Sequence, residues 1–487
     1  MAATTAAAPG FAEEQKTSSY ASDATAATGD ASAPDPSNWS IRMMDVFSGL
    51  RTDRAEAGNP AVMTYNDELT SRINLTASAA QRERAIVDQY GDMSLTMADG
   101  LGQRLGDIYA KAVEAGELPK TTWLLSKSGG KIGSSSSTNP PKNFFDYDRP
   151  YLRLDPTTQL TYVDKVGGDA WGSTSGAFPS GHTSQAFWQG TTLAVMLPEL
   201  APQILARTAE AGDNRIVMGA HYALDVISGR MMGQKIVQLR LADEQMRGLV
   251  AEASRELRGV LEEGCGDDLA ACIVADTPYL STEAALSSYE DRLGYDFPAI
   301  GATDAPVVVP AGAETLLASS HPDLSNAQRR QVLALTAAPA GHPLDVGEEE
   351  SWQRLDLAAA MSATVTVGAD GDVSLGAPPV VPAPVPSPEP TPAPSPDPAP
   401  EPSPEPSAEP TPAPSPEPSP EPTAAGPSDG SDEPGDDVDA APAVPASGEG
   451  SLAQTGGDTG VVWLGAGAGT VLVALGALLI WRRRALM

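Results

Sequence analysis

The stretch from Phe178 to Asp225 decides the fold, and it reads FPSGHTSQAF at residues 178–187 and NRIVMGAHYALD at residues 214–225. It holds two of the four histidines in the chain, His182 and His221. An earlier block, KNFFDYDRP at residues 142–150, adds two cations and a proline. Because the three blocks combine histidines, cations, glycine and a carboxylate, we expect them to meet in one site.

The cations and the glycine turn are suited to binding phosphate. A phosphoryl group in transfer carries negative charge on three equatorial oxygens, and preplaced cations and amide donors stabilise it. Lys142, Arg149 and Arg215 are the candidate cations, and arginine offers paired donors that match phosphate geometry. Ser180 and Gly181 directly precede a helical pattern, so backbone amides there can approach an anion at a helix N-terminus.

His221 and Asp225 are four residues apart, so in a helix they would share a face. The carboxylate could then accept a hydrogen bond from one ring nitrogen and leave the other nitrogen free to attack phosphorus. This pattern makes His221 the candidate nucleophile. The chemistry needs no divalent metal, and we predict none.

The three blocks spell K-x6-R-P, P-S-G-H and R-x5-H-x3-D. Together they resemble the signature of the type 2 phosphatidic-acid phosphatase (PAP2) superfamily, over about residues 39–249. That superfamily includes bacterial class A non-specific acid phosphatases, lipid phosphatases and vanadium haloperoxidases. Asn214 stands where the superfamily usually has serine, directly before the candidate phosphate-binding arginine.

The resemblance implies a mechanism and a substrate class. His221 would form a phosphohistidine, and His182 would protonate the leaving alkoxide and then activate the water that hydrolyses the intermediate. The expected function is an acid phosphatase that hydrolyses small phosphate monoesters without a cofactor. A vanadium haloperoxidase remains an alternative, since vanadate mimics phosphate, as does a surface adhesin that keeps the fold without the chemistry. A lipid phosphatase is disfavoured because the catalytic region contains no apolar span.

Apolar spacing predicts helices through the catalytic region, residues 39–262. Between Met93 and Val113, five apolar residues could share one buried face: Leu95, Leu101, Leu105, Ile108 and Val113. Further helical patterns cover residues 183–197 and 222–261, and alternating strand patterns are scarce. We therefore predict an all-α helical bundle.

A smaller, mostly helical appendage is predicted at residues 263–375. Helical patterns occur at 326–337 and 351–361, and a short strand pattern occurs at 363–368. Its two histidines, His321 and His342, lie beside prolines, and we predict that both are surface residues.

The two cysteines, Cys265 and Cys272, are separated by six residues. In an exported protein so close a pair forms a short disulfide loop, whereas in the cytosol both would stay reduced. Since export is expected for the reasons below, we predict the disulfide. The spacing fits no zinc pattern.

The chain is strongly acidic, with 31 Lys plus Arg against 64 Asp plus Glu and a formal charge of -33. Affinity for nucleic acid depends mostly on Lys and Arg, so nucleic acid is an improbable partner. Residues 1–38 form a predicted flexible leader, and we expect that a signal peptide has been trimmed from it or lies upstream.

Residues 376–450 repeat proline-rich units such as PSPEP, which hold a chain near polyproline II and form a disordered, semi-rigid linker. Residues 461–481 form an uncharged run long enough to cross a bilayer as one helix, followed by three arginines that favour the cytoplasmic side. The plain interpretation of this end is a permanent membrane anchor.

The motif LAQTG at residues 452–456 precedes that run. Motif, span and basic tail, together residues 452–487, resemble a Gram-positive sortase sorting signal in its actinobacterial form. The resemblance implies cleavage between Thr455 and Gly456 and attachment of Thr455 to peptidoglycan. We therefore expect a secreted, wall-anchored protein that uses the membrane only transiently and has sortase and peptidoglycan as partners.

Overall fold

The computed structural model describes residues 38–54, 58–126, 130–133, 137–161, 175–345 and 351–376, all within one compact unit. Most of the predicted leader, the proline-rich linker beyond residue 376, Thr455, Gly456 and the apolar run at 461–481 lie outside these residues. Within the described ranges, no helix is both long and apolar enough to cross a bilayer.

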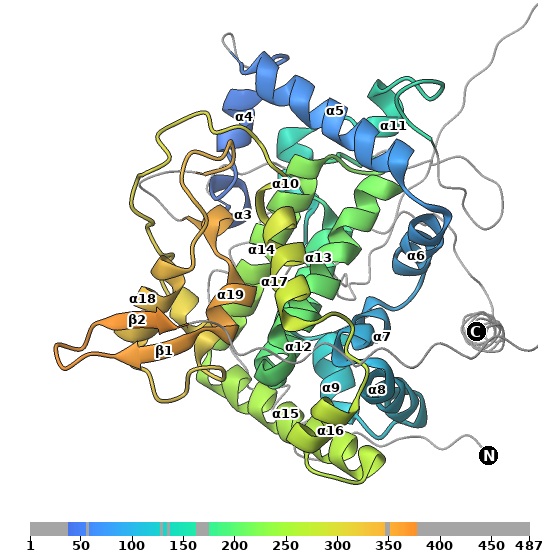
Figure 1. Ribbon diagram of the computed structural model, residues 1–487. Helices are drawn as coiled ribbons and strands as arrows, with labels where there is room; N and C mark the ends of the chain where they lie inside the picture. The colour runs from blue at the N-terminus through green and yellow to red at the C-terminus, as the bar shows by residue number, and fades with distance from the viewer. Residues whose placement is uncertain are drawn as a thin grey trace, which may run out of the picture. The chain divides into compact units, whose positions relative to one another are not determined.

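Helices make up almost all regular structure in the described residues, which confirms the all-α prediction (Figure 1). The first half contains α3 (Trp39–Arg42), α4 (Val46–Leu50), α5 (Pro60–Thr76), α6 (Ala79–Tyr90), α7 (Met93–Thr96), η2 (Met97–Leu101), α8 (Gln103–Ala115), α9 (Pro119–Leu125), α10 (Asn139–Phe145) and α11 (Pro150–Arg153). Then follow α12 (Gly181–Met196), η3 (Pro198–Leu200), α13 (Ala201–Val217), α14 (Ala223–Ala242) and α15 (Glu244–Cys265). The C-terminal part contains α16 (Leu269–Ala275), α17 (Thr282–Gly294), η4 (Ala313–Leu317), α18 (Asn326–Leu335), η5 (Trp352–Arg354), α19 (Leu357–Ser362), β1 (Thr364–Val367) and β2 (Val373–Gly376).

Helix α12 is the central helix, packed against α13 and α14 (Figure 1). All of its residues except Val195 are buried, as expected for a helix enclosed on every side. Glycines on α14 allow the close approach: a Cβ on Gly229 would lie 2.7 Å from the carbonyl oxygen of Ser180, and one on Gly233 would lie 2.5 Å from Phe187 Cβ. This packing sets the start of α12 against the first turns of α14.

Two predicted helices are divided in the structure. The pattern from Met93 onward breaks into α7, η2 and α8, and Gly102, with a φ of 102°, makes the turn between the last two. Leu95 consequently lies on the surface, whereas Leu101 and Leu105 are buried. The pattern at 222–261 breaks at Asp243, whose side chain caps α15 by accepting from the Met246 amide at 2.8 Å.

Helix α13 was not predicted, although it lies between the two site-bearing motifs. Its last turns contain Gly212, Asp213, Asn214 and Arg215, which interrupt any simple apolar stripe. All four are nevertheless buried. An amphipathic pattern presumes that polar residues face water, so it fails for a helix whose polar residues are buried against neighbouring segments.

The appendage shares one hydrophobic core with the helical bundle, since residues of both belong to the same buried cluster. Strands β1 and β2 pair antiparallel, with Thr364 opposite Gly376. The predicted elements at 326–337, 351–361 and 363–368 correspond to α18, to η5 with α19, and to β1. Helices α16 and α17 and strand β2 were not predicted.

The prediction that both appendage histidines are surface residues is wrong. His342 is buried, with its ring edge-on to Phe297 at a centroid distance of 5.4 Å. His321 is half-buried, with Nε2 2.8 Å from the carbonyl oxygen of Ala360. Neighbouring prolines shape the loops, but both histidines pack against other residues of the appendage.

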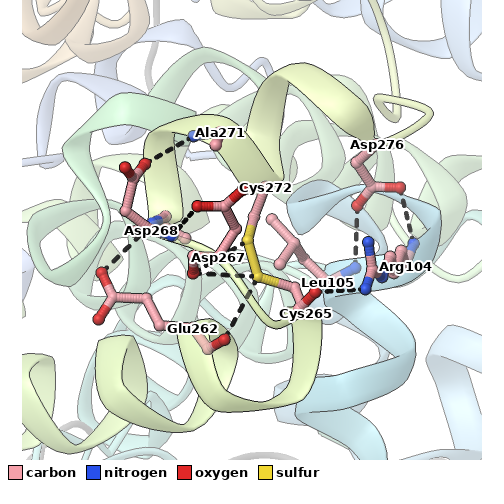
Figure 2. The surroundings of a disulfide bond; sticks show 10 residues. Arg104, Leu105, Glu262, Cys265, Asp267, Asp268, Ala271, Cys272 and Asp276 are labelled. Atoms are coloured by element: carbon pink, nitrogen blue, oxygen red, sulfur yellow. Dashed lines mark hydrogen bonds between the residues drawn. A yellow bond between two sulfur atoms is a disulfide. The ribbon is translucent and has the colours of Figure 1, made fainter.

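Cys265 and Cys272 form a disulfide across the turn between α15 and α16, with a Cα–Cα distance of 6.2 Å (Figure 2). Asp268 caps α16 by accepting from the Ala271 amide at 2.8 Å. At the other end of α16, Asp276 accepts from the backbone amide of Arg104 at 2.8 Å and so caps α8 (Figure 2). The disulfide thus closes a turn that connects two helix ends.

Candidate active site

The turn before α12 is attached directly to α14. Ser180 is the N-cap of α12, and its Oγ accepts from the Thr183 amide at 3.3 Å. The Ser180 amide donates to the backbone carbonyl of Asp225 at 2.9 Å. The N-terminus of α12, whose dipole favours an anion, therefore lies beside the first turn of α14.

His221 and Asp225 are in contact, although not within one helix as the spacing suggested. Helix α14 begins at Ala223, so His221 lies in the preceding loop and Asp225 lies in the first turn. His221 Nδ1 is 3.2 Å from Asp225 Oδ2, and the Tyr222 amide donates to the same oxygen at 2.9 Å. Both His221 and Asp225 are buried.

Arg149 lies on the other side of the His221 ring. Its Nη1 is 3.3 Å from His221 Nε2 and 3.4 Å from the carbonyl oxygen of Ala220. Because a guanidinium group can only donate, Nε2 is the acceptor in this contact and carries a lone pair. The proton is therefore assigned to Nδ1, which donates a hydrogen bond to Asp225.

The loop at residues 175–176 holds two of the predicted cations. Arg149 donates from Nε to the Ser175 carbonyl at 3.0 Å and from Nη2 to the Ser175 hydroxyl at 2.9 Å. Lys142 donates from Nζ to the Gly176 carbonyl at 2.5 Å, and both cations are buried. The sequence did not point to Ser175 or Gly176, which contribute backbone and hydroxyl oxygens rather than a motif.

Arg215 stands at the end of α13, and its carbonyl accepts from the amides of Ala220 and His221 at 3.1 and 3.3 Å. Its Nη1 donates to Gln89 Oε1 on α6. The neighbouring Asn214 donates to Asp88 Oδ2 at 2.7 Å. Two successive residues of α6 thus contact two successive residues of α13. One of the latter, Asn214, stands where the superfamily usually has serine.

The residues predicted as one site affect one another electrostatically. Burial is the main cause that holds the pKa of His221 well below its usual value. Four neighbouring side chains lower it further, in the order Arg149, Lys142, Arg215 and His182. The imidazole of His221 is therefore protonated less readily than that of an exposed histidine.

His182, in the first turn of α12, is buried and near enough to affect the pKa of His221. Burial raises the pKa of Asp225 to about 7, against opposing effects of the Tyr222 amide, Lys142 and Arg149. These cations surround a single histidine–aspartate pair, an arrangement that favours an anionic ligand.

In the part of the chain that the structure describes, no three His, Cys, Asp or Glu side chains are grouped closely enough to hold a metal ion. The cations around His221 would suit phosphate or its mimic vanadate.

Comparison with known proteins gives a consistent result. Residues 124–247 match the model of the PAP2 superfamily. The chain is similar to the non-specific acid phosphatases of Salmonella typhimurium, at 29% identity over 143 residues, and Salmonella typhi, at 27% over 139 residues. Each match covers 28% of this chain and 54% of that protein.

An acid phosphatase of Zymomonas mobilis is 33% identical over 116 residues, which cover 24% of this chain and 42% of that protein. The chain spans about half the length of the curated relatives that it matches. Most residues of the candidate site, from Lys142 to Asp225, fall within the matched segment, whereas α6 with Asp88 and Gln89 lies before it. Residues 124–247, which hold most of the candidate site, are thus similar to proteins of the PAP2 superfamily.

Proposed function

We propose that the protein is a phosphatase that hydrolyses small phosphate monoesters through a phosphohistidine on His221. The observation that carries this proposal is the placement of the His221 ring between Asp225 on Nδ1 and Arg149 on Nε2. The first contact fixes the proton on Nδ1, and the second lies where a phosphate group would arrive.

In the first step, Nε2 of His221 attacks phosphorus and the bond between phosphorus and the ester oxygen breaks. The leaving alkoxide takes a proton from His182. Arg149, Lys142 and Arg215, with the amides at the start of α12, would stabilise the charge on the equatorial oxygens. Asp225 would stabilise the positive charge that develops on the imidazole.

In the second step, water attacks the phosphohistidine and gives a proton to His182. The bond between Nε2 and phosphorus breaks, orthophosphate leaves, and both histidines return to their starting states. Both steps use only protein side chains and water, so the proposed reaction requires no cofactor.

The test uses purified full-length protein and p-nitrophenyl phosphate. We expect hydrolysis that persists in EDTA, and a phosphoryl group on His221 when the reaction is quenched in base and analysed by mass spectrometry. Hydrolysis by His221→Ala at the wild-type rate would exclude the mechanism. Halide oxidation with vanadate and peroxide, in the absence of ester hydrolysis, would instead indicate a haloperoxidase.

We also propose that the protein is secreted and attached to the cell wall through Thr455. The support is the order of LAQTG, the apolar run at 461–481 and the three arginines after it. In a sortase-containing host, wild-type protein should stay in the wall after detergent extraction and be released by a muralytic enzyme. The variant Thr455→Ala should move to the detergent-soluble membrane fraction. Wild-type protein in that fraction would instead support a permanent membrane anchor.

A further inference from the structure

Arg153, the last residue of α11, connects parts of the fold that no motif joins. Its Nη1 and Nη2 donate to the two carboxylate oxygens of Asp67 on α5, at 3.1 and 3.0 Å. Nη1 also donates to the hydroxyls of Tyr147 at 2.6 Å and Tyr222 at 2.9 Å. The guanidinium carbon lies 5.1 and 5.4 Å from the centroids of the two tyrosine rings.

Tyr222 links this cluster to the candidate active site, because it directly follows His221 and is the N-cap of α14. Its amide donates to the Asp225 oxygen that also pairs with His221. The ring is buried, and its hydroxyl is fixed by Arg153. A shift of the Tyr222 ring would therefore move the peptide that determines both the His221 ring and its contact with Asp225.

We propose that Arg153, anchored by Asp67, is a positioning residue of the active site that acts by holding Tyr222 and, through it, His221. This inference rests on the proposed phosphatase function, in which His221 is the nucleophile. Arg153 lies outside the three motif blocks. Its side chain is about one-third exposed, with a relative accessibility of 32%. Its anchor Asp67 lies before the segment that matches the PAP2 superfamily.

Arg153 also affects the charge of the site. Asp225 interacts with His221 and with the phenols of Tyr147 and Tyr222. Four further groups act on it, namely the Tyr222 amide, Lys142 of α10, Arg149 before α11 and Arg153 of α11. All four lower the pKa of Asp225 against the effect of burial. Since Lys142 and Arg149 are candidate phosphate ligands, Arg153 is the one cation of this set that can be changed without removing a phosphate contact. Its loss should raise the pKa of Asp225.

The experiment compares Arg153→Met, Arg153→Lys and Tyr222→Phe in the full-length chain. The matched control is Arg258→Met, since Arg258 makes a similar two-bond pair with Glu199, at 2.9 and 2.7 Å, and has a side-chain accessibility of 29%. That pair joins α15 to η3, and no contact of either residue reaches His221 or Asp225 among the described hydrogen bonds and ion pairs.

We expect Arg153→Met to lower kcat for p-nitrophenyl phosphate on the order of tenfold, with KM changed less than about twofold, because the nucleophile is misplaced while the phosphate ligands stay. The acid limb of the profile of kcat/KM against pH should move to higher pH. Arg153→Lys keeps the charge and should leave that limb in place, with a smaller loss of kcat. Tyr222→Phe should also lower kcat, by about threefold.

Arg153→Met with wild-type kcat and an unmoved acid limb would overturn the positioning role and leave the phosphatase function intact. If the wild-type protein hydrolyses no ester, the proposed function fails, and a second readout still tests Arg153. The imidazole ¹⁵N signals of His221, identified by their loss in His221→Ala, should shift in Arg153→Met and stay unchanged in Arg258→Met. Unchanged signals in Arg153→Met would reject the inference regardless of activity.

Discussion

Helix α14 contributes to two buried clusters that have the same three residue types, histidine, aspartate and arginine. The cluster at its start is formed by His221, Asp225 and Arg149, and the second, between α14 and the appendage, is formed by His342, Asp356 and Arg230. All six residues are buried.

Burial affects the two clusters in the same way. It is the largest cause of the lowered pKa of both histidines, and it brings the pKa of His342 to about 3. It also raises the pKa of Asp225 to about 7 and that of Asp356 to about 6. A shifted pKa therefore does not by itself distinguish an active site from an interior polar cluster.

The partners of these groups do distinguish the clusters. Arg230 donates to the backbone carbonyls of Leu293 at 3.1 Å and Gln353 at 2.7 Å. His342 Nδ1 accepts from the Leu344 amide at 3.0 Å, and Asp356 caps α19. The second cluster thus uses its side chains to satisfy backbone groups of the appendage. In the first cluster the side chains bond backbone groups too, but His221 also contacts both Asp225 and Arg149 directly.

The strongest test of this contrast replaces each histidine. His221→Ala should lower kcat/KM for p-nitrophenyl phosphate by at least about 10³-fold, because the proposed nucleophile is lost. His342→Ala should keep activity within about threefold and lower the free energy of unfolding by about 1–3 kcal/mol, since it leaves a cavity. Equal loss of activity in the two variants would break the contrast.

The two arginines should differ in their effect on activity, at a somewhat smaller scale. Arg149→Met should lower kcat/KM by about 10²-fold through the loss of a phosphate donor, and it should also lower the free energy of unfolding, because the Ser175 and Ala220 carbonyls lose their donor. Arg230→Met leaves buried carbonyls without their donor and should lower the free energy of unfolding by about 3 kcal/mol, with kcat retained. If Arg230→Met were instead inactive and as stable as wild type, the second cluster would be the one that takes part in catalysis.

The motif residues of the first cluster could be predicted from sequence because their chemistry constrains their spacing. A histidine, an arginine and a carboxylate in a short segment, with a glycine turn before a helix, predict a phosphate site before any tertiary contact is known. The structure brings His221, Asp225, Arg149 and Lys142 together as that pattern implies.

The supporting residues could not be predicted in this way. Asp88 and Asn214 are 126 positions apart, and only the packing of α6 on α13 makes an amide at position 214 a suitable partner for that carboxylate. Arg153 looks like an ordinary surface arginine at the end of a short helix. His342 was expected at the surface because local polarity does not reveal that its loop covers α17.

The smallest expected effect is the pH dependence of the free energy of unfolding that Asp225 and Asp356 cause, and it compares the two clusters most directly. A carboxyl whose pKa is raised on folding contributes stability that is fully present below its unfolded value, near 4, and is lost as pH rises through the folded value. Urea unfolding should therefore find that Asp225→Asn gains about 2 kcal/mol relative to wild type between pH 5 and pH 8, and Asp356→Asn about 1 kcal/mol. His221 has the opposite effect, because its lowered pKa costs stability as pH falls below about 6.5, and the difference from wild type removes the part of that effect that does not depend on Asp225. If the gap between Asp225→Asn and wild type stayed constant with pH, the Asp225 carboxyl would already be ionised at pH 5. The surrounding cations would then outweigh burial, and the first cluster would be ready for catalysis at a lower pH than burial alone allows.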